Sequence, residues 1–257
     1  MGMTRKTHSM ANKEQRRAAA QERIQLVEGL YKNEIQATVE GALLYEQVPS
    51  PDGKPARYAT TEIEVADIDA VGAAAKAQGK ACVLDFASYL HPGGGYDRGA
   101  WAQEEALCAE SNLFNILDRL RKVFYDVNRN TINDGLYTDR ALYLTDVVFV
   151  PSSGTRKCDV IVCAAPNRRR ALETHSCNIC DEAMASRVRT VMGIAAANEV
   201  DELVLGAFGC GVFGNNATFV ARLFKEWLDQ NPGIFRKVVF AVPGGKNLAA
   251  FKEMFTE

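Results

Sequence analysis

Long apolar runs are missing from this sequence of 257 residues. No stretch approaches the roughly 18 residues of a membrane-spanning helix, so we expect no membrane partner. Residues 1–17 are polar and charged without an apolar segment, which argues against a secretory signal. Charge of one sign is not in excess either: the formal net charge is -2, which gives no overall electrostatic reason to bind nucleic acid. We therefore expect no sequence-specific binding of nucleic acid.

Histidine is scarce, with three residues, and no complete set of zinc ligands stands out. Cys177 and Cys180 are separated by two residues and His175 lies just before them, but a structural zinc site takes four ligands. A pair of reduced thiols in a loop is the better interpretation, and a zinc site stays open as the alternative. The seven cysteines are odd in number and mostly lie in apolar segments, which favours reduced, buried thiols and a cytoplasmic location.

The spacing of apolar residues predicts alternating strands and helices, typical of an α/β fold with a largely parallel sheet. The expected helices are residues 11–32, 67–79 (capped by Asp67), 100–122, 181–198, 217–230 and 246–255. The expected strands are residues 58–65, 81–87, 141–150, 158–164, 202–206 and 236–242, with short strands possible at 35–39 and 42–45. Neither an internal repeat nor a break in composition divides the chain, so we expect one domain over residues 11–257 and a disordered segment at 1–10.

A triple glycine follows the strand at 81–87. Gly93-Gly94-Gly95 costs more backbone entropy than a turn requires, which indicates that main chain approaches a ligand closely. Glu104 and Glu105 follow at the start of a helix. Acids are common there because the helix dipole favours them, but two carboxyls beside apolar surface also have raised pKa values, which suits a proton donor. His91 is either a catalytic base or a surface residue that orients the loop.

A second glycine-rich loop, residues 206–216, follows another strand and precedes a helix. Its free amides and the helix N-terminus could hold an anion, and a tight turn is the plainer alternative. The loop fits neither the Walker pattern nor the dinucleotide fingerprint. Phe208 and Phe213 could stack on a base or sugar, or belong to the core. The run Arg168-Arg169-Arg170 could meet phosphate, although such runs are more often solvated.

The stretch from Val83 to Ser111 resembles the bacterial-type poly(ADP-ribose) glycohydrolases, which have the macrodomain fold. The likeness is carried by Gly93-Gly94-Gly95 and, seven residues later, Gln103-Glu104-Glu105. Residues 163–167 and 206–216 resemble that family's later strand end and diphosphate loop. The resemblance spans most of the chain from about residue 20. It implies a macrodomain-like three-layer sandwich with a mixed, mostly parallel central sheet and an N-terminal helical extension.

The resemblance also implies an activity, the hydrolysis of the ribose–ribose O-glycosidic bond from the end of poly(ADP-ribose). Glu105 would protonate the leaving 2′-oxygen and then activate water, and Glu104 would hold the ribose hydroxyls. Gly93 to Gly95 and residues 209–214 would approach the diphosphate from two sides, with Phe213 against the terminal ribose. The residues implied to surround the substrate are Asp85, Ala87, Ser88, Gly93, Gly94, Gly95, Gln103, Gly209, Cys210, Gly211, Val212, Phe213, Gly214 and Asn215. Neither a cofactor nor a metal is expected.

The residues by themselves agree with part of this interpretation, because an ADP-ribosyl acetal resembles a glycoside and a single acid can protonate its leaving oxygen. The expected partner is ADP-ribose or poly(ADP-ribose) on modified proteins. The alternatives are a hydrolase of mono-ADP-ribosylated protein or nucleic acid, a non-catalytic reader of ADP-ribose, and a nucleotide-binding α/β protein of other chemistry. The presence of both Glu104 and Glu105 argues against a reader, which needs no acid.

Overall fold

The structure, a computed structural model, describes residues 11–49, 55–150 and 154–256. Its seven-stranded central sheet consists of β1 (Leu43–Tyr45), β2 (Glu62–Ala66), β3 (Ala81–Phe86), β4 (Ala141–Phe149), β5 (Arg156–Cys163), β6 (Glu202–Leu205) and β7 (Lys237–Ala241). The strands are ordered β1-β4-β5-β3-β6-β7-β2. All neighbouring pairs from β5 to β2 are parallel, whereas β4 is antiparallel to both β5 and β1. The predicted mixed, mostly parallel sheet is confirmed.

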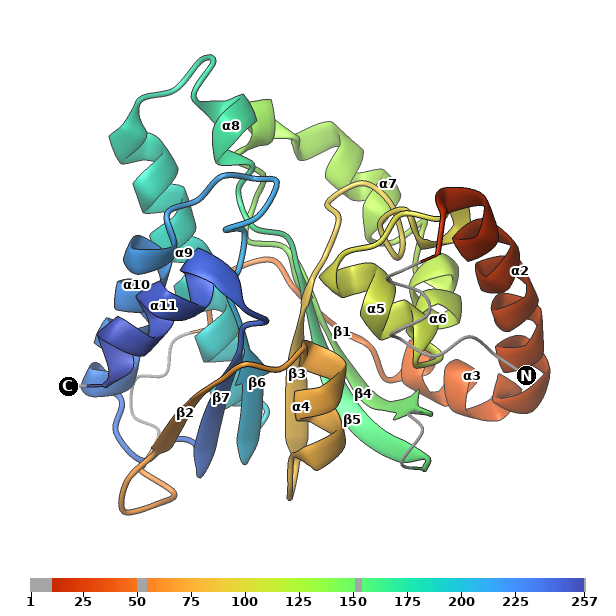
Figure 1. Ribbon diagram of the computed structural model, residues 1–257, viewed down its shortest axis with the longest axis horizontal. Coiled ribbons are helices and arrows are strands. Elements are labelled where there is room, and N and C mark those ends of the chain that lie inside the picture. The colour runs from red at the N-terminus through yellow and green to blue at the C-terminus, as the bar shows by residue number, and fades with distance from the viewer. Residues whose placement is uncertain (1–10, 50–54, 151–153, 257) are drawn as a thin grey trace.

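Helices lie on both sides of this sheet (Figure 1). One side carries α2 (Lys13–Leu30), α3 (Lys32–Glu40), α4 (Ala70–Lys76), α5 (Gln103–Ala109), α6 (Leu113–Arg119) and α7 (Tyr125–Asn128). The other side carries α9 (Cys177–Ala197), α10 (Ala217–Gln230) and α11 (Gly245–Phe255). The short helix α8 (Arg168–Ala171) and the 3-10 turns η1 (Tyr96–Arg98), η2 (Arg129–Thr131) and η3 (Asn133–Gly135) belong to connections. None of the helices in these ranges is both long and apolar enough to span a membrane.

The alternation of side chains along the central strands produces two separate cores. In β3, Val83 faces the core shared with α2 to α6, whereas Cys82 and Leu84 face the core shared with α9, α10 and α11. Because both faces of the central strands are buried, these strands are continuous apolar runs in the sequence. The three-layer arrangement predicted for the chain follows from this pattern.

Two helices precede the sheet. The helix expected at 11–32 is α2, and its N-terminus has a capping box in which Asn12 and Gln15 bond reciprocally. The strand considered for residues 35–39 is wrong, because these residues lie in α3, where Ile35 and Thr38 are buried about one turn apart. The second short strand, at 42–45, is present as β1. The disorder expected for residues 1–10 concerns a segment outside the described residues.

The helix predicted over 100–122 is divided into α5 and α6. The division arises because Asn112 pairs with the end of β4: its N–H donates to Val148 O and its Oδ1 accepts from Val148 N, both at 3.0 Å. The strand expected at 58–65 begins only at Glu62, since the amides of Arg57 and Tyr58 both donate to Gly233 O. Val148 and Gly233 are distant in the sequence from the residues they pair with, so neither boundary could be predicted from the local pattern.

Two helix starts also differ from the prediction. The cap of α4 is Asp69, whose carboxylate accepts from Gly72 N at 2.7 Å, whereas Asp67 accepts from Gly244 N at 2.8 Å. Helix α9 begins at Cys177 rather than at residue 181, because Ser176 provides its N-cap. The cysteine pair therefore lies in the first turn of a helix and not in a loop.

Candidate functional site

Two glycine-rich loops meet beyond the carboxyl ends of neighbouring strands, at the upper end of the sheet in Figure 1. The first glycine loop (residues 87–102) follows β3 and the second (residues 206–216) follows β6, and these two strands are paired. A cleft with a volume of about 530 Å³ lies between them. The predicted site residues that line it are Ala87, Ser88, Gly94, Gln103, Glu104, Glu105, Gly209, Gly211, Val212 and Phe213. The others, Asp85, Gly93, Gly95, Cys210, Gly214 and Asn215, are not among its lining residues.

Gly94 brings the first glycine loop against two carboxyl groups. Its φ is +61°, and a Cβ atom there would lie 2.6 Å from Oε1 of Glu105 and 2.8 Å from Oε2 of Glu104. Any side chain at this position would therefore displace the carboxyl groups themselves. The sequence alone indicated a close approach to a ligand, and the structure shows that the acids already require the glycine.

The amides of the triple glycine are engaged within the protein. Gly95 N donates to Oε1 of Glu105 at 2.9 Å, and Gly93 N donates to the carboxylate of Glu104. Gly94 N donates to a carbonyl oxygen of the same loop at 3.0 Å. These hydrogen bonds fix the two carboxyl groups at the floor of the cleft. The diphosphate contact expected of these amides would require them to leave their present acceptors.

Glu104 is buried, with an exposed fraction of 4%. Its Oε2 accepts from Ser88 N at 2.7 Å, whereas Oε1 has no hydrogen-bond partner in the described part of the chain. Burial, followed by the nearby carboxyls of Asp85 and Glu105, raises the pKa of Glu104 well above its usual value. The hydrogen bonds from Ser88 and Gly93 oppose this rise without cancelling it. Glu105, at the next position, is 6% exposed.

Asp85 lies behind the cleft, near the end of β3, and its exposed fraction is 0%. Neither of its carboxyl oxygens has a hydrogen-bond partner among the described residues. Burial, and then the carboxylate of Glu105, raise the pKa of Asp85 well above its usual value, which indicates a neutral carboxyl. A direct contact with substrate was expected at this position. The structure instead places Asp85 beneath the acids, so it can influence them but does not line the cleft.

Gln103 joins the start of α5 to the end of β3. Its Nε2 donates to Leu84 O at 2.7 Å, and its Oε1 accepts from Phe86 N at 2.8 Å. The two bonds satisfy backbone groups of β3 and hold the first turn of α5, which carries both glutamates, against the strand.

The second glycine loop leaves consecutive amides unoccupied. The loop is closed by hydrogen bonds from Asn215 N to Gly209 O and from Gly214 N to Gly211 O, both at 3.1 Å. The N–H groups of residues 211–213 donate to no other described residue. Successive free amides of this kind form an anion-binding concavity. Phe213 and Phe208 both line the cleft, but Phe208 has an exposed fraction of 0% and packs on Phe86 as part of the core.

Two tyrosines that the sequence did not indicate complete the cleft. Tyr89 and Tyr137 stack with ring centroids 4.3 Å apart, and the ring of Phe213 lies 6.3 Å from that of Tyr137. The buried Arg187 holds this region, because its guanidinium donates to Leu136 O and to Asp139. Tyr137 has a φ of +59°, a conformation that no local pattern predicts.

His91 and the candidate zinc ligands Cys177, Cys180 and His175 lie in different parts of the structure. His91 lines the cleft, and burial followed by the charges of neighbouring arginines lowers its pKa. Cys180 is buried and Cys177 exposed, and His175 Nε2 lies 3.6 Å from Asp134. Within the described ranges, no group of three or more His, Cys, Asp or Glu side chains could hold a metal ion.

An adjoining hollow of about 590 Å³ extends the cleft towards α4 and α11. Both cavities are lined by Phe86, Ala102, Gln103, Ala207 and Asn247. Because the lining is shared, the two cavities form one elongated depression that suits a ligand longer than a single sugar.

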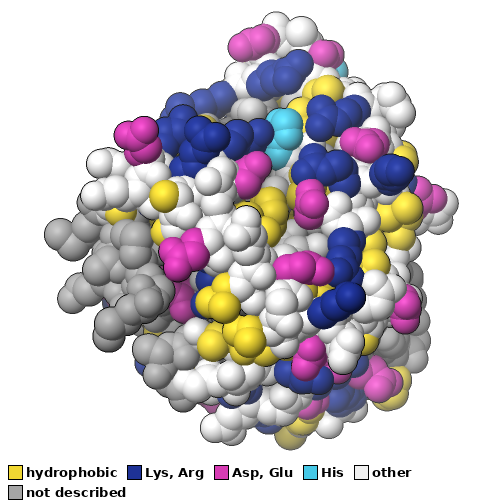
Figure 2. All heavy atoms as spheres, turned by 90° about the vertical axis from the view of Figure 1, so that its right-hand side faces the viewer, with side chains coloured by type: hydrophobic (Ala, Val, Ile, Leu, Met, Phe, Trp, Pro, Cys, Tyr) yellow, Lys and Arg dark blue, Asp and Glu magenta, His cyan; other side chains and the backbone are white. Residues whose placement is uncertain are grey.

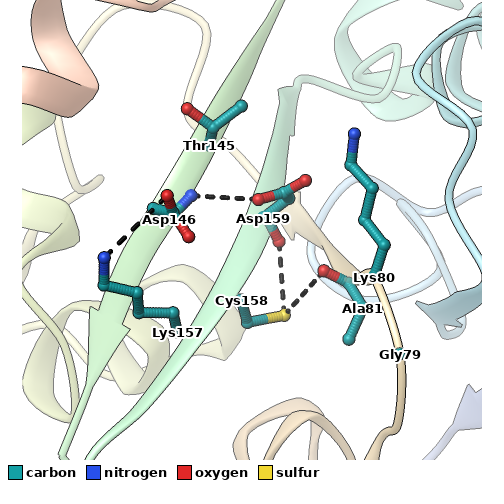
Figure 3. Close-up of a pocket in the computed structure, with 8 residues that line it drawn as sticks. All are labelled: Gly79, Lys80, Ala81, Thr145, Asp146, Lys157, Cys158 and Asp159. Carbon is teal, nitrogen blue, oxygen red and sulfur yellow. Dashed lines mark hydrogen bonds and ion pairs between the residues drawn. The ribbon is translucent and has the colours of Figure 1, made fainter.

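A smaller cavity of about 270 Å³ lies at the opposite end of the sheet, where β3 and β5 begin (Figure 3). Lys157 Nζ lies 3.9 Å from Asp146, and Asp159 accepts from Asp146 N at 2.9 Å and from the hydroxyl of Tyr143. These groups satisfy one another around the bulge of β4. We assign this cavity a structural role.

The family model for the microbial-type PARG (poly(ADP-ribose) glycohydrolase) catalytic domain matches residues 4–151. No curated protein sequence matches the chain. Among solved structures, the glycohydrolase from Thermomonospora curvata is similar at 30% identity, with a TM-score of 0.84 and coverage of 94% of this chain and 100% of that chain. The same enzyme bound to the inhibitor ADP-HPD gives a TM-score of 0.82 at 30% identity, with the same coverage of both chains.

The glycohydrolase from Deinococcus radiodurans in complex with ADP-ribose is similar at 31% identity, with a TM-score of 0.76 and coverage of 86% of this chain and 97% of that chain. The family model matches more than half of the chain, and the structural likeness extends over nearly all of it. The resemblance carried by the triple glycine and the glutamate pair is thus confirmed. The chain belongs to the microbial-type PARG family.

Proposed function

We propose that the protein is a poly(ADP-ribose) glycohydrolase that releases ADP-ribose from the end of the polymer, with Glu105 as its general acid and base. The observation that carries the proposal is the placement of two buried carboxyls around Gly94 at the floor of an elongated cleft. The second glycine loop, whose amides at residues 211–213 donate to no described residue, lines the same cleft as these carboxyls.

The reaction begins with protonation of the leaving oxygen. Glu105 gives its proton to the 2′-oxygen as the bond from that oxygen to the anomeric carbon breaks, which leaves an oxocarbenium-like sugar. The substrate's own phosphates stabilise the positive charge. Water then attacks the anomeric carbon and gives a proton to the carboxylate of Glu105, which restores the acid. Glu104 holds the ribose hydroxyls.

The remaining contacts are divided between the loops. The amides of residues 211–213 bind the diphosphate, because they have no acceptor among the described residues and lie in a glycine-rich turn. Phe213 and the stacked pair of Tyr89 and Tyr137 pack against the terminal ribose. Ala87, Ser88 and Gln103 line the cleft, and the side-chain amide of Gln103 also holds the start of α5 against β3.

Replacement of Glu105 tests the proposal directly. Glu105→Gln keeps an oxygen that can accept from Gly95 N, so the loop should persist while the proton donor is lost. Loss of a general acid lowers the rate by about 100-fold to 10,000-fold. We expect such a loss in the release of ADP-ribose from poly(ADP-ribose), with binding of ADP-ribose by calorimetry retained. Glu182→Gln, an exposed change on α9, is the control.

An unreactive parent protein, or a Glu105→Gln variant as active as the parent, would overturn the proposal. Faster turnover of mono-ADP-ribosylated protein than of the polymer would favour the mono-ADP-ribosyl hydrolase instead. Tight binding of ADP-ribose without turnover of any substrate would identify a reader.

A further inference from the structure

We propose that Arg169 and Arg170, supported by Arg98 and Arg129, bind the phosphates of the leaving unit. By the leaving unit we mean the ADP-ribose next to the terminal one, whose 2′-oxygen is the leaving group when the terminal ADP-ribose is released. We call these four arginines the acceptor rim. The rim makes a polymer a better substrate than ADP-ribose joined to an uncharged leaving group. This inference rests on the proposed function and specifies its substrate.

The position of the acids defines the side from which the leaving unit departs. Glu104 and Glu105 line the cleft together with His91 and Tyr137, but they do not line the adjoining hollow. The reacting ribose must lie beside the acids, in the cleft that His91 and Tyr137 also line. The remainder of the terminal ADP-ribose then reaches into the adjoining hollow. The leaving unit continues outward past these two residues.

Arg169 and Arg170 flank that side. Arg169 N donates to Phe213 O at 3.1 Å, and the side chain of Arg169 lies over Gly214, where a Cβ would be 3.0 Å from Nε. Arg170 packs beside Gly135, and its charge acts on the hydroxyl of Tyr137. The two side chains thus adjoin two aromatic residues that line the cleft.

Both arginines are exposed and carry uncompensated charge. Neither forms an ion pair with another described residue. Their neighbour Arg168 differs, because its guanidinium pairs with Asp181, and the nearby Asp134 faces His175. The basic run is therefore divided into one structural arginine and two that remain available to an anion.

Two further guanidinium groups lie on the opposite side of the cleft. Arg98 donates to Gly94 O at 2.7 Å and Arg129 to Leu90 O at 3.2 Å, and both acceptor residues line the cleft. Each has a nearby acid, with Asp97 at 3.8 Å and Asp126 at 3.5 Å, so these two contribute less net charge. Figure 2 views the molecule from the side on which α2 and α3 lie in Figure 1, and Lys and Arg side chains gather over the upper part of that view, with acidic side chains between them.

A leaving ADP-ribose unit carries a diphosphate, whereas a leaving serine or phenol carries none. Two exposed guanidiniums that each contact a phosphate should together change kcat/KM by about tenfold, since a solvent-exposed ion pair contributes little more than a threefold to fivefold effect. The effect should also decrease with salt, because each phosphate contact releases bound counterions.

The test compares two substrates. Arg169→Gln/Arg170→Gln is assayed on poly(ADP-ribose) and on an ADP-ribosyl O-aryl acetal, whose leaving group has no phosphate. Arg189→Gln/Arg222→Gln removes the same charge from exposed positions on α9 and α10 and is the control. We expect the rim variant to lose about tenfold in kcat/KM on the polymer, mainly through a higher KM, and several-fold less on the aryl substrate. Its dependence on salt should be shallower than that of the parent.

Equal losses on both substrates, or no loss on the polymer, would overturn the role of the rim while leaving the glycohydrolase intact. A parent protein that hydrolyses neither substrate would instead overturn the proposed function. If the parent hydrolyses only the polymer, the salt dependence decides: an unchanged slope in the rim variant contradicts the proposal, and a shallower slope supports it.

Discussion

Asp85 is a buried carboxyl group whose proton should be measurable. Burial and the neighbouring carboxylate of Glu105 raise its pKa, so the folded protein retains a proton that the unfolded chain loses above about pH 4. The folded state then binds more protons than the unfolded state. Stability is therefore highest below the unfolded pKa and falls as pH rises towards the folded pKa.

The magnitude follows from linkage. Each retained proton lowers the free energy of unfolding by about 1.4 kcal/mol per pH unit, or about 4 kcal/mol between pH 4 and pH 7 if the carboxyl is still protonated there. Asp85→Asn removes this ionisation with little change of shape. We expect the slope of unfolding free energy against pH, between about pH 5 and pH 7, to be shallower by about 1.4 kcal/mol per unit in the variant.

The measurement is urea unfolding of both proteins across this pH range, and the slope is the quantity to compare. The absolute stability is less informative, because the new amide is also buried without partners. Asp201→Asn is the control, because the pKa of Asp201 is shifted in the opposite direction to that of Asp85. Burial works to raise the pKa of Asp201, but hydrogen bonds from Tyr58, Lys80 N and Arg57 outweigh it and hold the pKa below its usual value. Loss of the Asp201 carboxylate should lower the free energy of unfolding by the same amount at every pH between about 5 and 7 and leave the slope unchanged. Identical slopes for the parent and Asp85→Asn would refute a protonated Asp85.

Two other changes test how the site is held. Gly94→Ala introduces a Cβ within 3 Å of the carboxyl oxygens of Glu104 and Glu105, so we expect turnover of poly(ADP-ribose) to fall by about 100-fold or more. The thermal midpoint should also fall by a few degrees, because alanine at a φ of +61° costs about 1 kcal/mol or more; a fully active variant would show that the carboxyls can shift without consequence. Arg187→Met leaves Asp139 and two carbonyl oxygens without their buried donor, which should lower the free energy of unfolding by about 3–5 kcal/mol in urea titrations, and a change below 1 kcal/mol would contradict this account.

The parts of the site that could be predicted from the sequence are those encoded locally. The triple glycine and Gln103-Glu104-Glu105 lie within one short segment, and a parallel sheet brings the ends of its strands to one edge. Because both glycine loops directly follow strands of this sheet, the sequence predicted that the two loops would meet at that edge. The division of the helix at Asn112 could not be predicted in this way, because it depends on Val148, which is 36 residues away.

The aromatic side of the cleft was also beyond a local pattern. Tyr137 stacks on Tyr89, 48 positions earlier, and the loop that carries it is held by Arg187. Arginine in an apolar helix gives no sign of its acceptors until the fold is known. The burial of Asp85 was missed for a related reason: a polar residue near a strand end usually faces solvent, but here both faces of the strand are covered.

The two glycine loops have different tasks, and this difference explains why the site needs both. In the first loop the amides hold the glutamates, so its glycines serve the acids. In the second loop three amides donate to no described residue, so its glycines suit the proposed anion site. The distance between acid and anion site is then set by strand pairing, because β3 and β6 are hydrogen-bonded with Val83 opposite Val204. A rigid sheet register thus fixes the separation between the proposed proton donor and the proposed phosphate site, which flexible loops alone could not hold.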